Sequence, residues 1–128
     1  MKQYISWVLI AVCIVGLISC GKKAEPVVLP AVNEIDSINI MTYEGAEVSY
    51  SDKEWIEQFF AVITQAEATA KESVQDIPNT EFYGKVDISS NGEITTIFYY
   101  TEGGKNYIEQ PYQGIYVSNV DIDALMNE

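Results

Sequence analysis

Hydrophobic and polar residues recur along the chain with two periods, one typical of strands and the other of a helix. Two short strand-like runs, residues 37–43 and 46–51, flank Glu44-Gly45 and predict a β-hairpin. Four further runs of this kind lie later in the chain, at residues 82–89, 93–101, 105–110 and 115–118. Most of the regular structure is therefore expected to be strand.

Residues 52–70 have the spacing of a helix instead. Ser51 and Glu54 match a capping box, which predicts that Ser51 caps the helix N-terminus. Apolar side chains then recur three or four residues apart, at Trp55, Ile56, Phe59, Phe60, Val62, Ile63 and Ala66. The aromatic members could form a ligand-binding cluster, but a face of this kind more often packs in a core. We expect the core role, and we expect the helix to end near residues 69–73.

The turn at Asn91-Gly92 leaves two registers open for the strands around it. A two-residue loop pairs Ile88 with Thr95, whereas a three-residue loop with a glycine bulge pairs Ile88 with Ile94. A slip of one residue moves every side chain of a strand to the other face. The bulged register separates apolar from polar residues more cleanly, so it is the predicted one.

Together these elements predict an α+β fold for a single domain at residues 35–128. We expect a small antiparallel sheet of about five strands with one main helix packed on one face, in the order β-β-α-β-β-β. A short C-terminal helix is expected at residues 121–126. The outer face of the sheet is expected to carry Tyr83, Tyr99 and Tyr107.

The first twenty residues have the pattern of an export signal. Lys2 precedes an apolar run at residues 5–19, which is short for a membrane span of about 20 residues. Leu17-Ile18-Ser19-Cys20 resembles the bacterial lipobox, whose cysteine receives a diacylglyceryl group on its sulfur before the preceding peptide is removed. The sequence therefore predicts a cleaved signal peptide at residues 1–19 and a lipid anchor at Cys20, on the extracytoplasmic face of the cell membrane. An uncleaved membrane anchor is the alternative.

Residues 20–34, which begin with the lipidated cysteine, are predicted to be a tether. Pro26 and Pro30 each disfavour a helix at the residue before them. Two acyl chains on such a tether would hold the domain stably at the bilayer. The apolar residues Val27, Val28 and Leu29 could dock on the domain instead.

Charge and residue usage exclude several classes of function. The 128 residues include 7 Lys and no Arg against 19 Asp and Glu, a net charge of −12, so nucleic acid is not an expected partner. The chain has no His, and its two cysteines fall in the signal peptide and at the lipidation site. The common nucleophile–base pairs and a His-ligated zinc site therefore cannot be assembled, and no cofactor is expected.

The acidic residues leave weaker alternatives. Two carboxylates could hydrolyse glycosides, but a domain of this size offers little material for a substrate cleft. A calcium loop starting at Asp121 fails, because its sixth position is Met126 instead of glycine. Scattered acidic residues could still bind calcium weakly, although a solvated acidic surface is the simpler explanation.

Two segments are unlike a generic surface: residues 72–78 (ESVQDIP) and residues 107–116 (YIEQPYQGIY). Their pairing, one after a helix and the other in a final strand segment, resembles an uncharacterised family of Gram-positive bacteria, domain of unknown function 5301, over about residues 35–126. The resemblance implies an exported, often lipid-anchored small domain. It implies no activity, substrate or cofactor.

Segment 107–116 and the tyrosines of the sheet face are the candidates for a binding site. The candidate binding residues are Glu109, Gln110, Tyr112, Gln113, Tyr83 and Tyr99. For segment 107–116 itself the favoured interpretation is structural: an irregular strand connection whose tyrosine hydroxyls bond to loop backbone, with Gly114 at a positive φ.

The favoured function is a non-enzymatic binding module at the cell surface, attached to the membrane through Cys20. Its partner would be an envelope protein, peptide or polymer. The alternative is a small hydrolase, or a hydrolase accessory, that acts on cell-envelope polymers.

Overall fold

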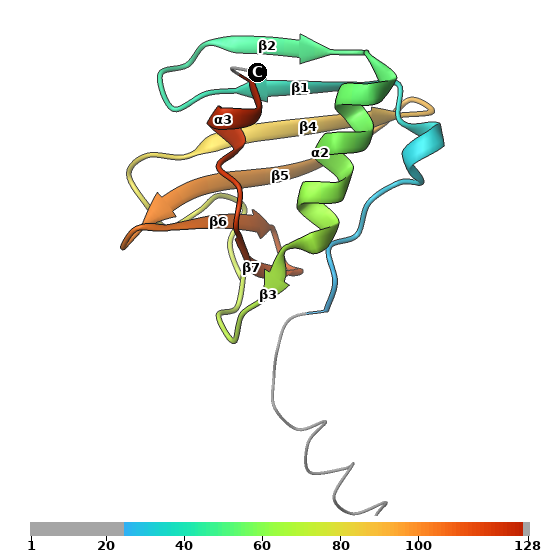
Figure 1. Ribbon diagram of the computed structural model, residues 1–128. Coiled ribbons are helices and arrows are strands. Elements are labelled where there is room, and N and C mark those ends of the chain that lie inside the picture. Colours follow the sequence, from blue (N-terminus) through green and yellow to red (C-terminus); the bar gives the residue numbers. More distant parts are fainter. Residues whose placement is uncertain (1–24, 127–128) are drawn as a thin grey trace, which may run out of the picture.

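The computed structural model describes residues 25–126, which form one antiparallel sheet with a main helix across one face (Figure 1). The seven strands lie in the order β2-β1-β4-β5-β6-β7-β3. They are β1 Ser37–Met41, β2 Glu47–Tyr50, β3 Glu67–Ala68, β4 Gly84–Ser90, β5 Glu93–Glu102, β6 Lys105–Gln110 and β7 Gly114–Ser118. The helices are the 3₁₀ turn η1 Val32–Glu34, α2 Lys53–Gln65 and α3 Ile122–Met126.

The predicted α+β class, antiparallel sheet and main helix are confirmed, but the sheet has seven strands and not about five. The predicted signal peptide, Cys20 and residues 21–24 of the predicted tether lie outside the described residues. Within residues 25–126, no helix is long and apolar enough to cross a membrane.

The ends of α2 differ from the prediction at both termini. The N-cap is Asp52 and not Ser51, because the Asp52 carboxylate accepts a bond from the Trp55 backbone N–H at 3.2 Å. At the other end, residues 67–68 leave the helix to pair with β7 as the short strand β3. The Thr69 backbone N–H and hydroxyl both bond to the Ile115 carbonyl, at 3.0 and 2.8 Å. These bonds to a sheet edge replace helical ones, so the predicted end near residues 69–73 is wrong.

The β4–β5 hairpin has the other of the two registers considered. Ile88 pairs with Thr95, and the predicted pairing with Ile94 is wrong. Asn91 and Gly92 both have positive φ, 52° and 82°, as a two-residue primed turn requires. The separation of apolar from polar residues predicts the wrong register because β5 is apolar on both faces. Both faces are buried at residues 97–100.

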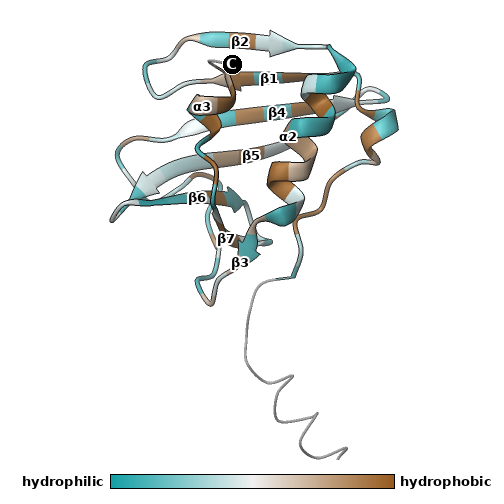
Figure 2. Ribbon diagram, in the orientation of Figure 1, coloured by the Kyte–Doolittle hydropathy of each residue, from teal (hydrophilic) through white to brown (hydrophobic). Residues whose placement is uncertain are grey.

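The core lies between α2 and the sheet. The helix contributes Ile56, Phe59 and Ile63, which confirms its predicted core face. The sheet contributes Ile38, Ile40, Val86, Ile88, Ile97, Tyr99, Ile108 and Tyr116. Figure 2 shows this apolar colouring across β1, β4 and β5 where α2 crosses them.

Tyr99 belongs to this helix-covered face, so its predicted place on the outer face beside Tyr83 and Tyr107 is wrong. The error arises from the register. Tyr99 pairs with Gly84, and its ring lies directly over that glycine, in the space that a Cβ at position 84 would need.

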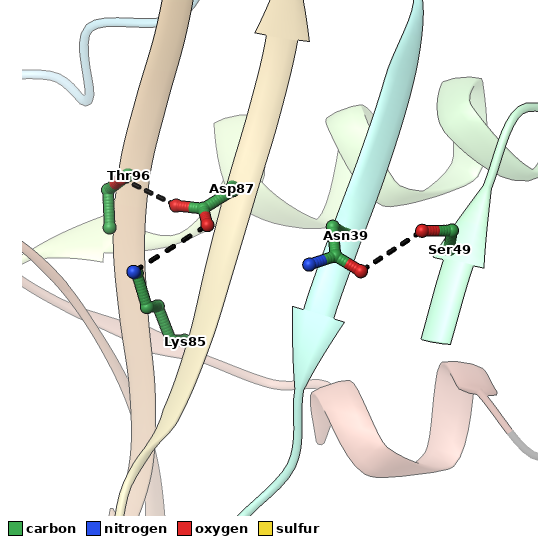
Figure 3. A network of polar contacts seen from close by, with 5 residues as sticks. All are labelled: Asn39, Ser49, Lys85, Asp87 and Thr96. Atoms are coloured by element: carbon green, nitrogen blue, oxygen red, sulfur yellow. Dashed lines mark hydrogen bonds and ion pairs between the residues drawn. The ribbon is translucent and has the colours of Figure 1, made fainter. Parts of the chain in front are cut away.

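The face of the sheet away from α2 has two parts. Over β2, β1 and β4 it is polar, and its side chains are half-buried or exposed. Figure 3 shows this face with the helices behind the sheet. There Ser49 donates to Asn39 at 3.0 Å, and Asp87 accepts from Thr96 at 2.6 Å and pairs with Lys85 at 3.7 Å.

Over β5, β6 and β7 the same face is covered by the loop at residues 69–83. The buried residues on this part of the sheet are Phe98, Tyr100, Glu109 and Ile115. No local pattern in the sequence indicates that a loop covers the second face, and this cover creates a pocket beside Glu109.

Candidate functional site

Glu109 on β6 is a buried carboxylate that holds the 69–83 loop against the sheet. It is 1% exposed. Its Oε2 accepts bonds from the Ser73 hydroxyl at 2.8 Å and from Gln75 Nε2 at 3.0 Å, and its Oε1 accepts from the Tyr100 hydroxyl at 3.2 Å. Burial, followed by the negative charge of Glu109, raises the pKa of Tyr100, so that hydroxyl keeps its proton and donates. Three neutral donors therefore hold the carboxylate.

The turn between β6 and β7 joins the same loop through Tyr112. Its backbone N–H donates to the Ser73 hydroxyl at 3.3 Å, and its own hydroxyl donates to Asp76 at 2.6 Å. Tyr112 has a φ of 62°, and Gly114 is the first residue of β7. The predicted positive φ at Gly114 is therefore wrong, because the left-handed residue of this turn is Tyr112. The two segments that carry the family resemblance, 72–78 and 107–116, thus contact one another.

Gln110 and Gln113 contact the chain's own N-terminal segment. The Gln110 side-chain amide bonds to both backbone groups of Val28: it accepts the N–H at 2.7 Å and donates to the carbonyl at 2.8 Å. Gln113 donates to the Pro26 carbonyl at 2.9 Å. Two candidate binding residues therefore already hold this chain's own backbone.

The rest of this N-terminal segment is docked too. The Tyr116 hydroxyl donates to the carbonyl of Glu25. The side chains of Val27 and Leu29 pack against the core, while that of Val28 is exposed. Of the two alternatives left by the sequence, docking on the domain is the one found for residues 25–29.

Tyr83 and Tyr99 lie on opposite faces of the sheet. Tyr83 packs edge-on against Phe98, with ring centres 5.5 Å apart. Tyr99, on the opposite face, donates to Asp123 at 2.9 Å and has its ring 5.3 Å from that of Tyr43. Burial, with the hydrogen bond and charge of Asp123, raises the pKa of Tyr99. The structure therefore links Glu109 and Tyr112 through Ser73, and places Tyr99 on the other face of the sheet.

A pocket of about 290 Å³ opens beside Glu109. It is lined by Lys71, Glu72, Gln75, Asn79, Tyr100, Glu102, Glu109 and Ile115. Lys71 Nζ lies 4.7 Å from the centre of the Tyr107 ring, which in turn stacks on Tyr100 with ring centres 5.5 Å apart. Three carboxylates against one ammonium group give this pocket an acidic, partly aromatic lining.

The sequence pattern indicates only part of this pocket. Glu109 is one of the predicted binding residues, and Glu72 and Gln75 fall in a segment singled out by the resemblance. Lys71, Asn79 and Glu102 come from stretches without a distinctive pattern, and only the covering loop brings them together. In the described part of the chain, no group of three or more acidic residues is placed to hold a metal ion.

Comparison with known proteins identifies the family. Residues 23–117 match the family model DUF5301, described as "Domain of unknown function (DUF5300)". The chain is also similar to a solved structure, "NMR structure of the protein from Ruminococcus gnavus", with 39% sequence identity and a TM-score of 0.70 over 79% of this chain and 99% of that one. No curated protein matches the chain. The resemblance carried by segments 72–78 and 107–116 is confirmed, and the chain belongs to the family of domain of unknown function 5301.

Proposed function

We propose that the protein is an exported lipoprotein whose domain is a non-enzymatic binding module on the extracytoplasmic face of the cell membrane. The anchoring part rests on the apolar run at residues 5–19 and on the lipobox-like end at Leu17-Ile18-Ser19-Cys20. The binding part rests on one observation, the acidic pocket beside Glu109.

The lining of the pocket suggests which chemistry it binds. Glu72 and Glu102 are exposed carboxylates at its wall, while Glu109 is buried and engaged with its three donors. Tyr100 lines the pocket and stacks on Tyr107, whose ring face already carries the Lys71 ammonium group at 4.7 Å from the ring centre. A basic side chain of an envelope protein or peptide fits this combination of charge and aromatic surface.

The chemistry beside the pocket favours binding over catalysis. Ser73 is the hydroxyl next to Glu109, but it is 5% exposed. Its oxygen donates to Glu109 and accepts the Tyr112 N–H, so both of its bonding directions are used within the fold. A substrate would have to displace these contacts before the hydroxyl could attack.

A crosslinked pulldown from intact cells tests the binding role. We expect the wild-type chain to capture a stoichiometric protein or peptide. The double variant Glu72→Gln/Glu102→Gln, which removes two exposed carboxylates from the pocket wall, should lose it. Glu93→Gln, an exposed carboxylate at the start of β5, is the matched control and should keep it. Capture that is equal in all three proteins would contradict a site at this pocket.

Two further measurements test the remaining parts of the proposal. Mass spectrometry of the membrane-extracted protein should give an N-terminal Cys20 with added acyl mass, whereas an intact Met1 would refute the anchor. Turnover of isolated envelope polymer that is lost on mutating one carboxylate would instead support the hydrolase alternative.

A further inference from the structure

Three exposed apolar side chains belong to two segments that meet at one end of the domain. Val74, Ile77 and Tyr112 are 67%, 53% and 66% exposed. The segments are held together because residues beside the first two bond to Tyr112: Ser73 accepts its N–H at 3.3 Å, and Asp76 accepts its hydroxyl at 2.6 Å. We call Val74, Ile77 and Tyr112 the apolar tip.

The N-terminal segment leaves the domain at this same end. Gln113, the neighbour of Tyr112, holds the Pro26 carbonyl at 2.9 Å, and Tyr116 holds that of Glu25. In Figure 1 the start of the described chain and the loop after β3 both lie at the β3–β7 end of the sheet. The docked segment therefore fixes which end of the domain faces the residues before residue 25.

The distance from this end to the proposed anchor is short. Five residue steps separate Cys20 from Glu25, and an extended chain spans at most about 3.6 Å per residue, or about 18 Å in all. A freely hanging tether from Cys20 to residue 34 would span up to about 50 Å by the same measure. Docking of residues 25–29 thus keeps the apolar tip close to the bilayer surface.

We propose that the apolar tip rests in the interfacial region of the membrane to which the chain is anchored. This inference rests on the proposed lipid anchor at Cys20. Tyrosine is suited to the interface because its ring is apolar and its hydroxyl polar, and Val74 and Ile77 add apolar area beside it. The short linkage raises the effective concentration of the tip at the surface, so a weak intrinsic affinity suffices.

Glu72 and Asp76 flank the tip, and their charge opposes contact with anionic lipids. The contact is therefore driven by apolar burial and not by charge. It should be stronger on zwitterionic vesicles than on anionic ones, and added salt should strengthen it on the anionic ones.

A cysteine label tests this orientation directly, because acylation of Cys20 and loss of Cys13 leave the mature chain without a free thiol. Ile77→Cys carries an environment-sensitive fluorophore in the full lipidated protein, reconstituted in phosphatidylcholine vesicles with brominated acyl chains. Ile94→Cys is the matched control, since Ile94 is also an exposed isoleucine, 66% exposed, but lies beside the β4–β5 turn. We expect quenching at position 77 to exceed that at position 94 at least threefold.

The outcomes separate this inference from the proposed anchor. If mass spectrometry finds Cys20 acylated and the two labels are quenched equally, the tip does not face the membrane and the inference is wrong, while the anchor stands. If Cys20 is unmodified and the protein does not bind vesicles, the anchor fails and the inference fails with it. Val74→Cys repeats the measurement on the same tip, so a folding defect of Ile77→Cys, detected by thermal unfolding, does not remove the test.

Discussion

Removing the Glu109 carboxylate should release the 69–83 loop and destabilise the domain. In Glu109→Ala, the hydroxyls of Ser73 and Tyr100 and the amide of Gln75 all lose their acceptor. Ser73 and Tyr100 are 5% and 6% exposed, so water replaces the carboxylate poorly. The two hydroxyls that lose their acceptor are therefore already out of contact with water.

The change in the free energy of unfolding depends on these three hydrogen bonds. A buried donor left without a partner costs about 1–3 kcal/mol. Gln75 is only half-buried and can turn to solvent, so two donors carry most of the cost. We expect Glu109→Ala to lower the free energy of unfolding by about 3–5 kcal/mol, a large share of the 5–15 kcal/mol typical of a domain. Glu109→Gln keeps one acceptor oxygen and should cost about 1–2 kcal/mol.

Urea unfolding followed by circular dichroism measures both variants, with Glu102→Ala as control, because Glu102 lines the same pocket but is exposed. Hydrogen exchange should also locate the effect, with faster exchange in residues 69–83 than in α2. A loss below about 1 kcal/mol for Glu109→Ala would refute the reasoning, since it would mean that the carboxylate does not hold the loop.

Other contacts lead to three more predictions. Gly84→Ala should cost about 1–3 kcal/mol in thermal unfolding, because its Cβ would overlap the Tyr99 ring; an unchanged Tm would contradict this. Above pH 10, stability should fall by about 1.4 kcal/mol per pH unit for each of Tyr99 and Tyr100, since the unfolded chain ionises there while burial raises both pKa values in the fold; a pH titration of urea unfolding should show a slope smaller by about 1.4 kcal/mol per pH unit in Tyr100→Phe. Gln110→Ala should speed hydrogen exchange of the Val28 amide about fivefold, corresponding to about 1 kcal/mol, and equal rates would show that the segment is held otherwise.

The sequence predicts the parts of the fold that depend on local pattern. The helix core face at Ile56, Phe59 and Ile63 is expected from spacing alone and is confirmed. The predicted end of the helix is wrong because residues 67–68 pair with the edge of β7. The spacing of their apolar neighbours does not indicate this pairing. Such pairing depends on a strand about fifty residues later in the chain, and no local signal encodes it.

The predicted hairpin register is wrong for a related reason. The choice between Ile94 and Thr95 as the partner of Ile88 assumes that one face of β5 is buried and the other is solvated. Phe98 and Tyr100 are buried on the face away from the helix, because the 69–83 loop covers them. Alternation reports the register only where one face meets water, and at residues 97–100 of β5 both faces are covered.

Of the predicted binding residues, Glu109 is the one that lines the pocket. The side chains of segment 107–116 divide between two tasks by strand alternation. Glu109 points to the outer face and holds the 69–83 loop, while its neighbour Gln110 points the other way and holds Val28 of the N-terminal segment. One strand end therefore fixes both the wall of the pocket and the point where the chain leaves the domain. A shift of β6 by one residue would exchange these two side chains and lose both contacts, which is a physical reason for the order Glu-Gln at this position.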